Sequence, residues 1–102
     1  MQEDILVDIA FESEVIHWRG PSPFFFVPVP SRYSAAIGRA ARSVSYGWGM
    51  VPVEVAIAGF DFQTALFPKD GGYLLPLKDA VRRKTGTVLG AEISLELRVR
   101  NT

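Results

Sequence analysis

The chain has 102 residues, of which 48% are hydrophobic and 22% are charged, a length and composition typical of one globular domain. Its 11 basic and 11 acidic residues give a formal net charge of zero, so no overall field attracts it to nucleic acid or to an anionic membrane. The absence of cysteine excludes disulfides, thiolate metal sites and a cysteine nucleophile. We expect a single domain over residues 1–102, as a monomer or a homodimer.

The N-terminal end indicates a cytoplasmic protein. Residues 1–4 include Glu3 and Asp4, where a secretory signal would carry basic residues. No apolar run approaches the roughly 20 residues that span a bilayer, and a chain without cysteine suits a reducing compartment. We therefore expect a cytoplasmic location and no membrane partner.

The first predicted element is a half-buried strand over residues 5–18. The hydrophobic residues of one face are Val7, Ile9, Phe11 and Val15. Acidic residues at positions 8, 12 and 14 fall on the opposite, solvated face, which is the two-residue period of a strand. Ile16 and Trp18 fall on the wrong face, and this predicts a bulge or bend near residues 13–15.

A turn at residues 20–23 leads into a second strand, residues 24–27, which is apolar on both faces and ends at or near Pro28. Ser31 is placed to cap a helix that runs to about Ser43. At about 100° per residue, the apolar arc of this helix consists of Tyr33, Ile37, Ala40, Ala41 and Val44. The side chains nearly opposite, which we expect to face water, are Arg32, Arg39 and Arg42.

Residues 51–58 and 61–67 form a predicted hairpin around Gly59-Phe60, a pair suited to a two-residue type II′ turn. Such a turn pairs Ile57 with Phe62, Val55 with Thr64 and Val53 with Leu66. All six side chains then share the core face, which supports the register. Ala65 and Phe67 fall on the opposite face of this hairpin.

The remaining elements are a loop at residues 68–72, a short strand at 73–75, a helix over 77–85 that ends at Gly86, and a last strand over 92–100. Six strands in so short a chain must close, or nearly close, to avoid long exposed edges. The expected fold is therefore mainly β: a small closed or nearly closed six-stranded β-barrel with two short helices.

Three stretches resemble one family, and they occur in the right order within a similarity that runs from Phe11 to Leu97. The stretches are residues 25–30 (FFVPVP), residues 49–53 (GMVPV), and residues 66–68 (LFP) with 71–78 (GGYLLPLK). They are similar to the prokaryotic family DUF1905, a domain of unknown function. The resemblance implies a small closed β-barrel and no established activity. Some members look fused to a YdeI/OmpD-associated segment, which residues 1–102 do not include.

The most favoured function is a non-enzymatic binding module for a small anionic ligand or a protein partner. Lys78 and Arg82 are four residues apart in the predicted helix, so both side chains lie on one side of it and can meet the same anion. Tyr73 and Phe67 are expected to wall this pocket with apolar surface. We expect neither a cofactor nor a metal.

Aromatic residues are more numerous than a small barrel core needs. They include Trp18, the run at residues 24–26, Tyr46, Trp48, Phe60 and Phe67. Some of them must be partly exposed, and exposed aromatic side chains mark ligand pockets or protein contacts.

Two alternatives remain open. The first is a regulator that binds nucleic acid through Arg32, Arg39 and Arg42, a hypothesis that the zero net charge disfavours. Its basic face would be extended by Lys78, Arg82 and Arg83 if the two helices were neighbours. The second is a small hydrolase in which His17, the one histidine, activates a serine hydroxyl. The candidate nucleophiles are Ser13, Ser22, Ser34 and Ser43.

Overall fold

The computed structural model describes residues 4–18 and 24–101, with backbone only for Asp4, Trp18 and Phe24. The expected turn at residues 20–23, including Ser22, lies outside the described residues. The strands are β1 (Asp4–Glu14), β2 (Ile16–Trp18), β3 (Phe24–Pro28), β4 (Val51–Ile57), β5 (Phe60–Lys69), β6 (Gly72–Leu77) and β7 (Glu92–Asn101). The helices are a 3-10 turn, η1 (Ser31–Tyr33), then α1 (Ser34–Val44) and α2 (Asp79–Thr85).

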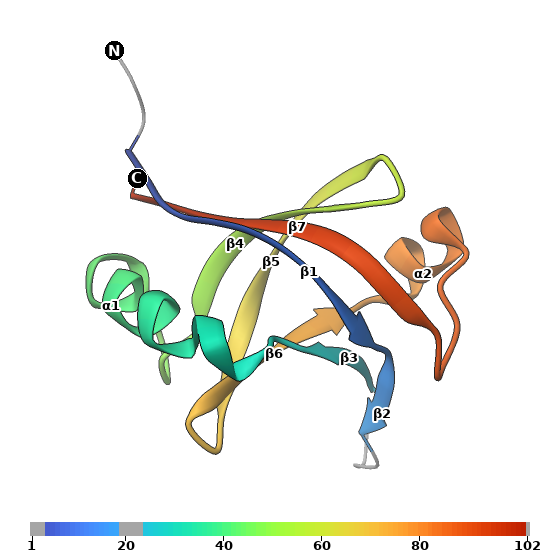
Figure 1. Ribbon diagram of the computed structural model, residues 1–102, viewed down its shortest axis with the longest axis horizontal. Helices are drawn as coiled ribbons and strands as arrows, with labels where there is room; N and C mark the ends of the chain where they lie inside the picture. The colour runs from blue at the N-terminus through green and yellow to red at the C-terminus, as the bar shows by residue number, and fades with distance from the viewer. Residues whose placement is uncertain (1–3, 19–23, 102) are drawn as a thin grey trace.

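The strands form one antiparallel sheet in the order β1-β7-β4-β5-β6-β3-β2, which curls into an open half-barrel (Figure 1). The mainly β class and the two helices are confirmed, whereas the closed six-stranded barrel is wrong. The predicted strand over residues 5–18 is interrupted at Val15, so that β1 pairs with β7 and β2 pairs with β3. β1 and β2 are thus the two edges of the sheet. Near the C-terminal end of β1, the hydroxyl of Ser13 donates a hydrogen bond to the carbonyl oxygen of Pro28 in β3 (2.7 Å).

The hydrophobic core lies inside the half-barrel and follows the predicted alternation. On β4 the odd positions are buried, and β7 buries Leu95, Leu97 and Val99 in the same way. Ile37 and Ala40 of α1 pack on this core, and the arginines of that helix face solvent as predicted. Each fully buried Val, Ile or Leu side chain contributes roughly 1.5–3 kcal/mol to the stability of the fold. The buried residues of the core therefore account for most of the driving force for folding.

The β4–β5 hairpin is confirmed, but its predicted register is wrong by two residues. The turn is Ala58-Gly59, where φ is 51° and 80°, and the positive φ at both positions is typical of a type I′ turn. The observed pairs are Ile57 with Phe60, Val55 with Phe62, Val53 with Thr64 and Val51 with Leu66. Because a shift of two residues keeps every side chain on its face, the core assignment survives the error.

Both helices begin later than predicted. Ser31 is not the N-cap of α1: it opens η1, and Tyr33 precedes α1 without a side-chain cap. α2 begins at Asp79 because Leu77 still pairs with Phe25 as part of β6. Gly86 ends α2 as predicted, with φ of 70°. None of the helices in the described part of the chain is long and apolar enough to cross a membrane.

Candidate functional site

The alternation along β6 decides which of the predicted site residues meet. Leu75 and Leu77 are buried on the core side, and Tyr73 packs on the same side, where its hydroxyl lies close to Gly38 of α1. Leu74 and Pro76 face the other way, because successive residues of a strand point to opposite faces. Tyr73 and Phe67 therefore lie on different faces of the sheet and do not wall one pocket.

An apolar groove of about 450 Å³ lies on the outer face of β3, β5 and β6. We call it the aromatic groove. It is lined by Phe26, Tyr46, Met50, Gln63, Thr64, Ala65, Phe67, Pro76, Leu77 and Lys78. The rings of Phe26 and Phe67 meet edge to face, with centroids 5.8 Å apart. Among these lining residues, Lys78 alone carries a charge.

A short loop beside the groove presents Trp48 to solvent. Tyr46 and Met50 exchange two backbone hydrogen bonds, of 3.0 and 2.9 Å, at the base of this loop. Gly47 and Gly49 have φ of 58° and 87°, so the chain reverses tightly between them and places Trp48 at the tip, 96% exposed. We call residues 46–50 the Trp48 loop, and its two base residues also line the aromatic groove.

The structure brings together two of the four predicted site residues, Phe67 and Lys78. Lys78 is the N-cap of α2 with extended backbone (ψ 159°), so it precedes the helix that was expected to carry it. Arg82 points elsewhere, since its guanidinium carbon lies 3.8 Å from the ring centroid of Phe25 and the side chain pairs with Asp79. This geometry therefore does not support the hypothesis that Lys78 and Arg82 bind one anion together.

The basic face of α1 is exposed as predicted, at Arg32, Arg39 and Arg42. The guanidinium carbon of Arg32 lies 4.7 Å from the ring centroid of Tyr33. The two helices lie at opposite sides of the half-barrel (Figure 1). The expected extension of this face by Lys78, Arg82 and Arg83 is therefore wrong, and the basic face is confined to α1 and η1.

His17 lies exposed on β2, with its ring centroid 5.3 Å from that of Phe25. Within residues 4–18 and 24–101 no serine hydroxyl is hydrogen-bonded to it, and Ser13 Oγ donates to a backbone carbonyl instead. In the same described ranges there is no group of three His, Cys, Asp or Glu side chains that could hold a metal ion. The described residues thus assemble no nucleophile and base pair.

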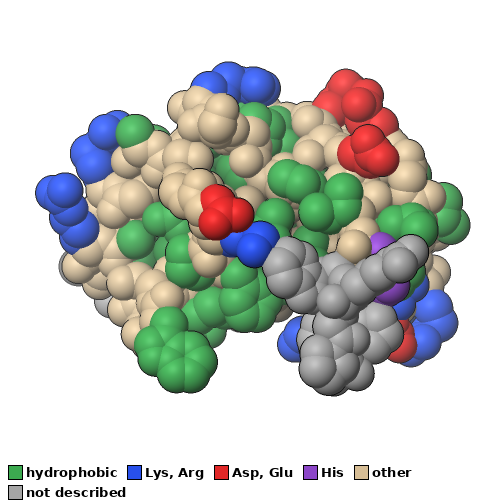
Figure 2. Space-filling view, turned by 90° about the horizontal axis from the view of Figure 1, so that it is seen from below, with side chains coloured by type: hydrophobic (Ala, Val, Ile, Leu, Met, Phe, Trp, Pro, Cys, Tyr) green, Lys and Arg blue, Asp and Glu red, His purple; other side chains and the backbone are tan. Residues whose placement is uncertain are grey.

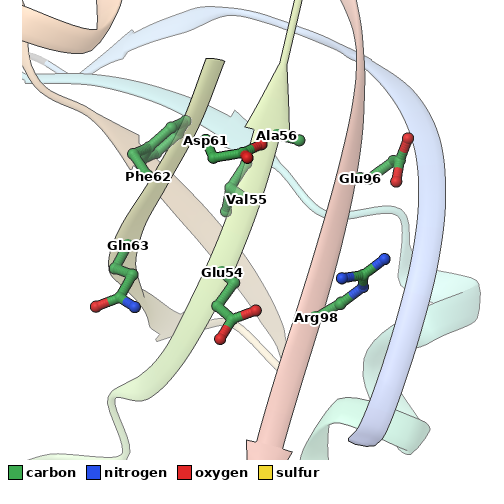
Figure 3. A pocket seen from close by; sticks show the side chains of 8 residues that line it. All are labelled: Glu54, Val55, Ala56, Asp61, Phe62, Gln63, Glu96 and Arg98. Atoms are coloured by element: carbon green, nitrogen blue, oxygen red, sulfur yellow. The ribbon is translucent and has the colours of Figure 1, made fainter. Parts of the chain in front are cut away.

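A second hollow, of about 430 Å³, lies on the outer face of β4, β5 and β7 (Figure 3). Its charged lining residues are Glu54, Asp61, Glu96 and Arg98. Arg98 pairs with Asp8 on β1 (3.4 Å), and Glu54 accepts a hydrogen bond from Arg100 Nε (2.7 Å). Glu54 and Arg98 are half-buried and paired, whereas Asp61 and Glu96 are exposed, a pattern typical of the solvated side of a sheet.

Sequence reasoning missed Met50, Gln63 and Thr64 as groove residues. The sequence did indicate Ala65 and Phe67, because the alternation of the strand places both on the face opposite the core. Tyr46 and Met50 reach the groove only because the glycines of the Trp48 loop turn the chain back on itself. Figure 2 shows exposed hydrophobic side chains over the lower left of the molecule, with Lys and Arg side chains mainly at its margin.

Together these features define a small, mainly β half-barrel domain that carries an aromatic groove on its outer face. The chain belongs to the family described as Domain of unknown function (DUF1905), whose family model matches residues 11–97. This confirms the resemblance seen in the sequence. No curated protein matches the chain.

Proposed function

We propose that this domain is a non-enzymatic binding module whose aromatic groove takes a small ligand with an apolar body and one anionic group. The observation that carries the proposal is the single cation, Lys78, beside lining residues that are otherwise uncharged. An ammonium group forms strong, charge-assisted hydrogen bonds with a carboxylate or phosphate. The apolar body would cover Met50 and Phe67, from which it would displace water.

The polar groups of the groove are few, as in most small-molecule sites. The side-chain amide of Gln63 and the hydroxyl of Tyr46 are the uncharged groups available to orient a ligand. Within residues 4–18 and 24–101 Lys78 forms no ion pair, so an incoming anion would not have to displace a carboxylate. We extend the proposal to the cytoplasmic, prokaryotic setting that the sequence predicts.

Titration followed by amide chemical shifts tests this function. The probes are octanoate and 4-phenylbutyrate, each matched with its uncharged amide. We expect shifts at Met50, Ala65, Phe67 and Lys78 with the acids, and weaker binding of the amides. Lys78→Ala should lower the affinity for the acids about tenfold or more, whereas Lys84→Ala, an exposed lysine at the end of α2, should leave it unchanged.

Equal binding of acid and amide, or no shifts at the groove at millimolar probe, would refute the anionic ligand. A peptide that ends in an acidic residue and binds where the small acids do not would assign the same groove to a protein partner.

The second candidate is nucleic-acid binding by the basic face of α1. It is favoured by the exposure of Arg32, Arg39 and Arg42 on a segment that contains no acidic residue. Binding of a short duplex that weakens steeply with salt, and that is lost in Arg39→Ala/Arg42→Ala, would support it. The same double variant should leave binding of octanoate unchanged.

A further inference from the structure

Three aromatic side chains in or next to the groove are more exposed than hydrophobic side chains usually are. Trp48 is 96% exposed, Tyr46 56% and Phe67 40%. Contiguous exposed apolar surface on a soluble domain marks an interaction site, and Trp and Tyr are enriched among the residues that dominate binding energy. Trp48, Tyr46 and Phe67 thus identify an interaction surface made of the Trp48 loop and the aromatic groove.

The Trp48 loop is braced against the rest of the protein. Its base is closed by the two Tyr46–Met50 backbone hydrogen bonds. On one side it approaches β5 closely, since a Cβ on Gly49 would lie 3.3 Å from Cγ of Pro68. The backbone that carries Trp48 is therefore preorganised, and docking of this side chain would cost little loop-ordering entropy.

This surface is complementary to itself. It contains a protruding indole and, beside it, an apolar groove, and both are built on Tyr46 and Met50. A two-fold axis that passes near this loop base would carry the Trp48 of each copy to the groove of the other. Such an arrangement is the isologous contact on which most dimers are built. We propose that a second copy of this chain docks here, with Trp48 of each protomer inserted into the aromatic groove of its partner.

Charge and area are compatible with this occupant. The formal net charge of zero means that two copies do not repel one another at long range. Lys78 at the groove would meet the face of the incoming indole, a favourable cation–π contact. From their exposed fractions, the three aromatic side chains offer on the order of 400 Å² per protomer, about half of the roughly 800 Å² that a standard interface buries on each side. We therefore expect a weak, concentration-dependent dimer.

The dimer goes beyond the proposed ligand function. A groove filled by the partner's indole cannot also hold a ligand, so a bound acid would dissociate the dimer. Since the dimer is measured without any ligand, it can fail while ligand binding holds, and the reverse is equally possible.

Sedimentation velocity over a wide concentration range is the test. The wild type should dimerise with a dissociation constant in the micromolar to sub-millimolar range, and Trp48→Ala should weaken the dimer about tenfold or more. Leu89→Ala is the matched control, because it removes another exposed hydrophobic side chain (55% exposed) that lies on a different loop, and it should dimerise like the wild type. All variants should unfold at similar temperatures, since both side chains face solvent.

A mixing experiment separates insertion of Trp48 from a general loss of apolar surface. Trp48→Ala keeps the groove, and Ala65→Arg fills the groove but keeps Trp48. If the indole enters the groove, the two variants mixed together should associate more strongly than either alone, because one of the two contacts is restored. A wild type that stays monomeric at millimolar concentration, a Trp48→Ala that dimerises as well as the wild type, or a mixture no stronger than its components would overturn the proposal.

Discussion

The guanidinium carbon of Arg82 lies 3.8 Å from the ring centroid of Phe25. This contact joins α2 to β3, two elements that are far apart in the sequence. It also explains why Arg82 is absent from the aromatic groove, four residues after the lysine that lines it. Arg82 thus has a structural role, because its contact with Phe25 stabilises the packing of α2 on the sheet.

Arg82→Ala should therefore destabilise the protein by about 1–2 kcal/mol through the lost cation–π contact and packing. Arg83→Ala, the exposed neighbour on the same helix, is the control and should change stability by less than about 0.5 kcal/mol. Urea unfolding measures both. Equal stability of the two variants would show that the Arg82–Phe25 contact contributes nothing.

The type I′ turn offers a stabilising substitution. Ala58 has φ of 51°, a conformation that Asn adopts more readily than Ala, and Asn-Gly is the preferred pair for this turn. Ala58→Asn should raise stability by about 0.5–1 kcal/mol, because the left-handed conformation is less unfavourable for Asn than for Ala. Ala56→Asn makes the same exchange in the extended part of β4 and should lower stability instead. Thermal unfolding of the two variants compares them, and a destabilised Ala58→Asn would contradict the assigned turn.

Val53 and Glu54 are adjacent on β4 and differ in face. Val53→Asp should abolish folding, because it buries a carboxylate in the core. Glu54→Lys would leave stability unchanged if Glu54 were simply solvated, as its position on the face opposite Val53 would predict. However, Glu54 accepts a hydrogen bond from Arg100, so we expect a loss of about 1 kcal/mol from its replacement by a positive charge.

Glu54→Gln keeps a hydrogen-bond acceptor without the charge and should fall between the wild type and Glu54→Lys in urea unfolding. If Glu54→Lys were as stable as the wild type, the ion pair between Glu54 and Arg100 would contribute nothing to the free energy of unfolding.

The fold should not depend on a metal ion. No suitable cluster of His, Asp or Glu side chains occurs in the ranges that the structure describes, and the chain has no cysteine. The unfolding midpoint should therefore be the same with and without a chelator. A fall of several degrees on adding the chelator would reveal a carboxylate site.

Local patterns in the sequence determined the mainly β class, most strand positions and the faces of β4, β5 and β7. Alternation in a strand depends only on neighbouring residues, so Val51, Val53 and Val55 could be assigned to the core without any knowledge of their partners. The same alternation assigned Phe67 to the outer face.

The tertiary structure alone decided how these elements meet. The alternation over residues 5–18 predicts a bend near residues 13–15, but it does not show that the chain leaves β7 there and pairs with β3 instead, because that choice depends on partners distant in the chain. The site followed the same rule. β6 continues through Leu77, which pairs with Phe25, and α2 therefore begins later than predicted. For this reason Lys78 lines the aromatic groove and Arg82 does not. The spacing of residues along the sequence cannot predict such pairing between distant strands.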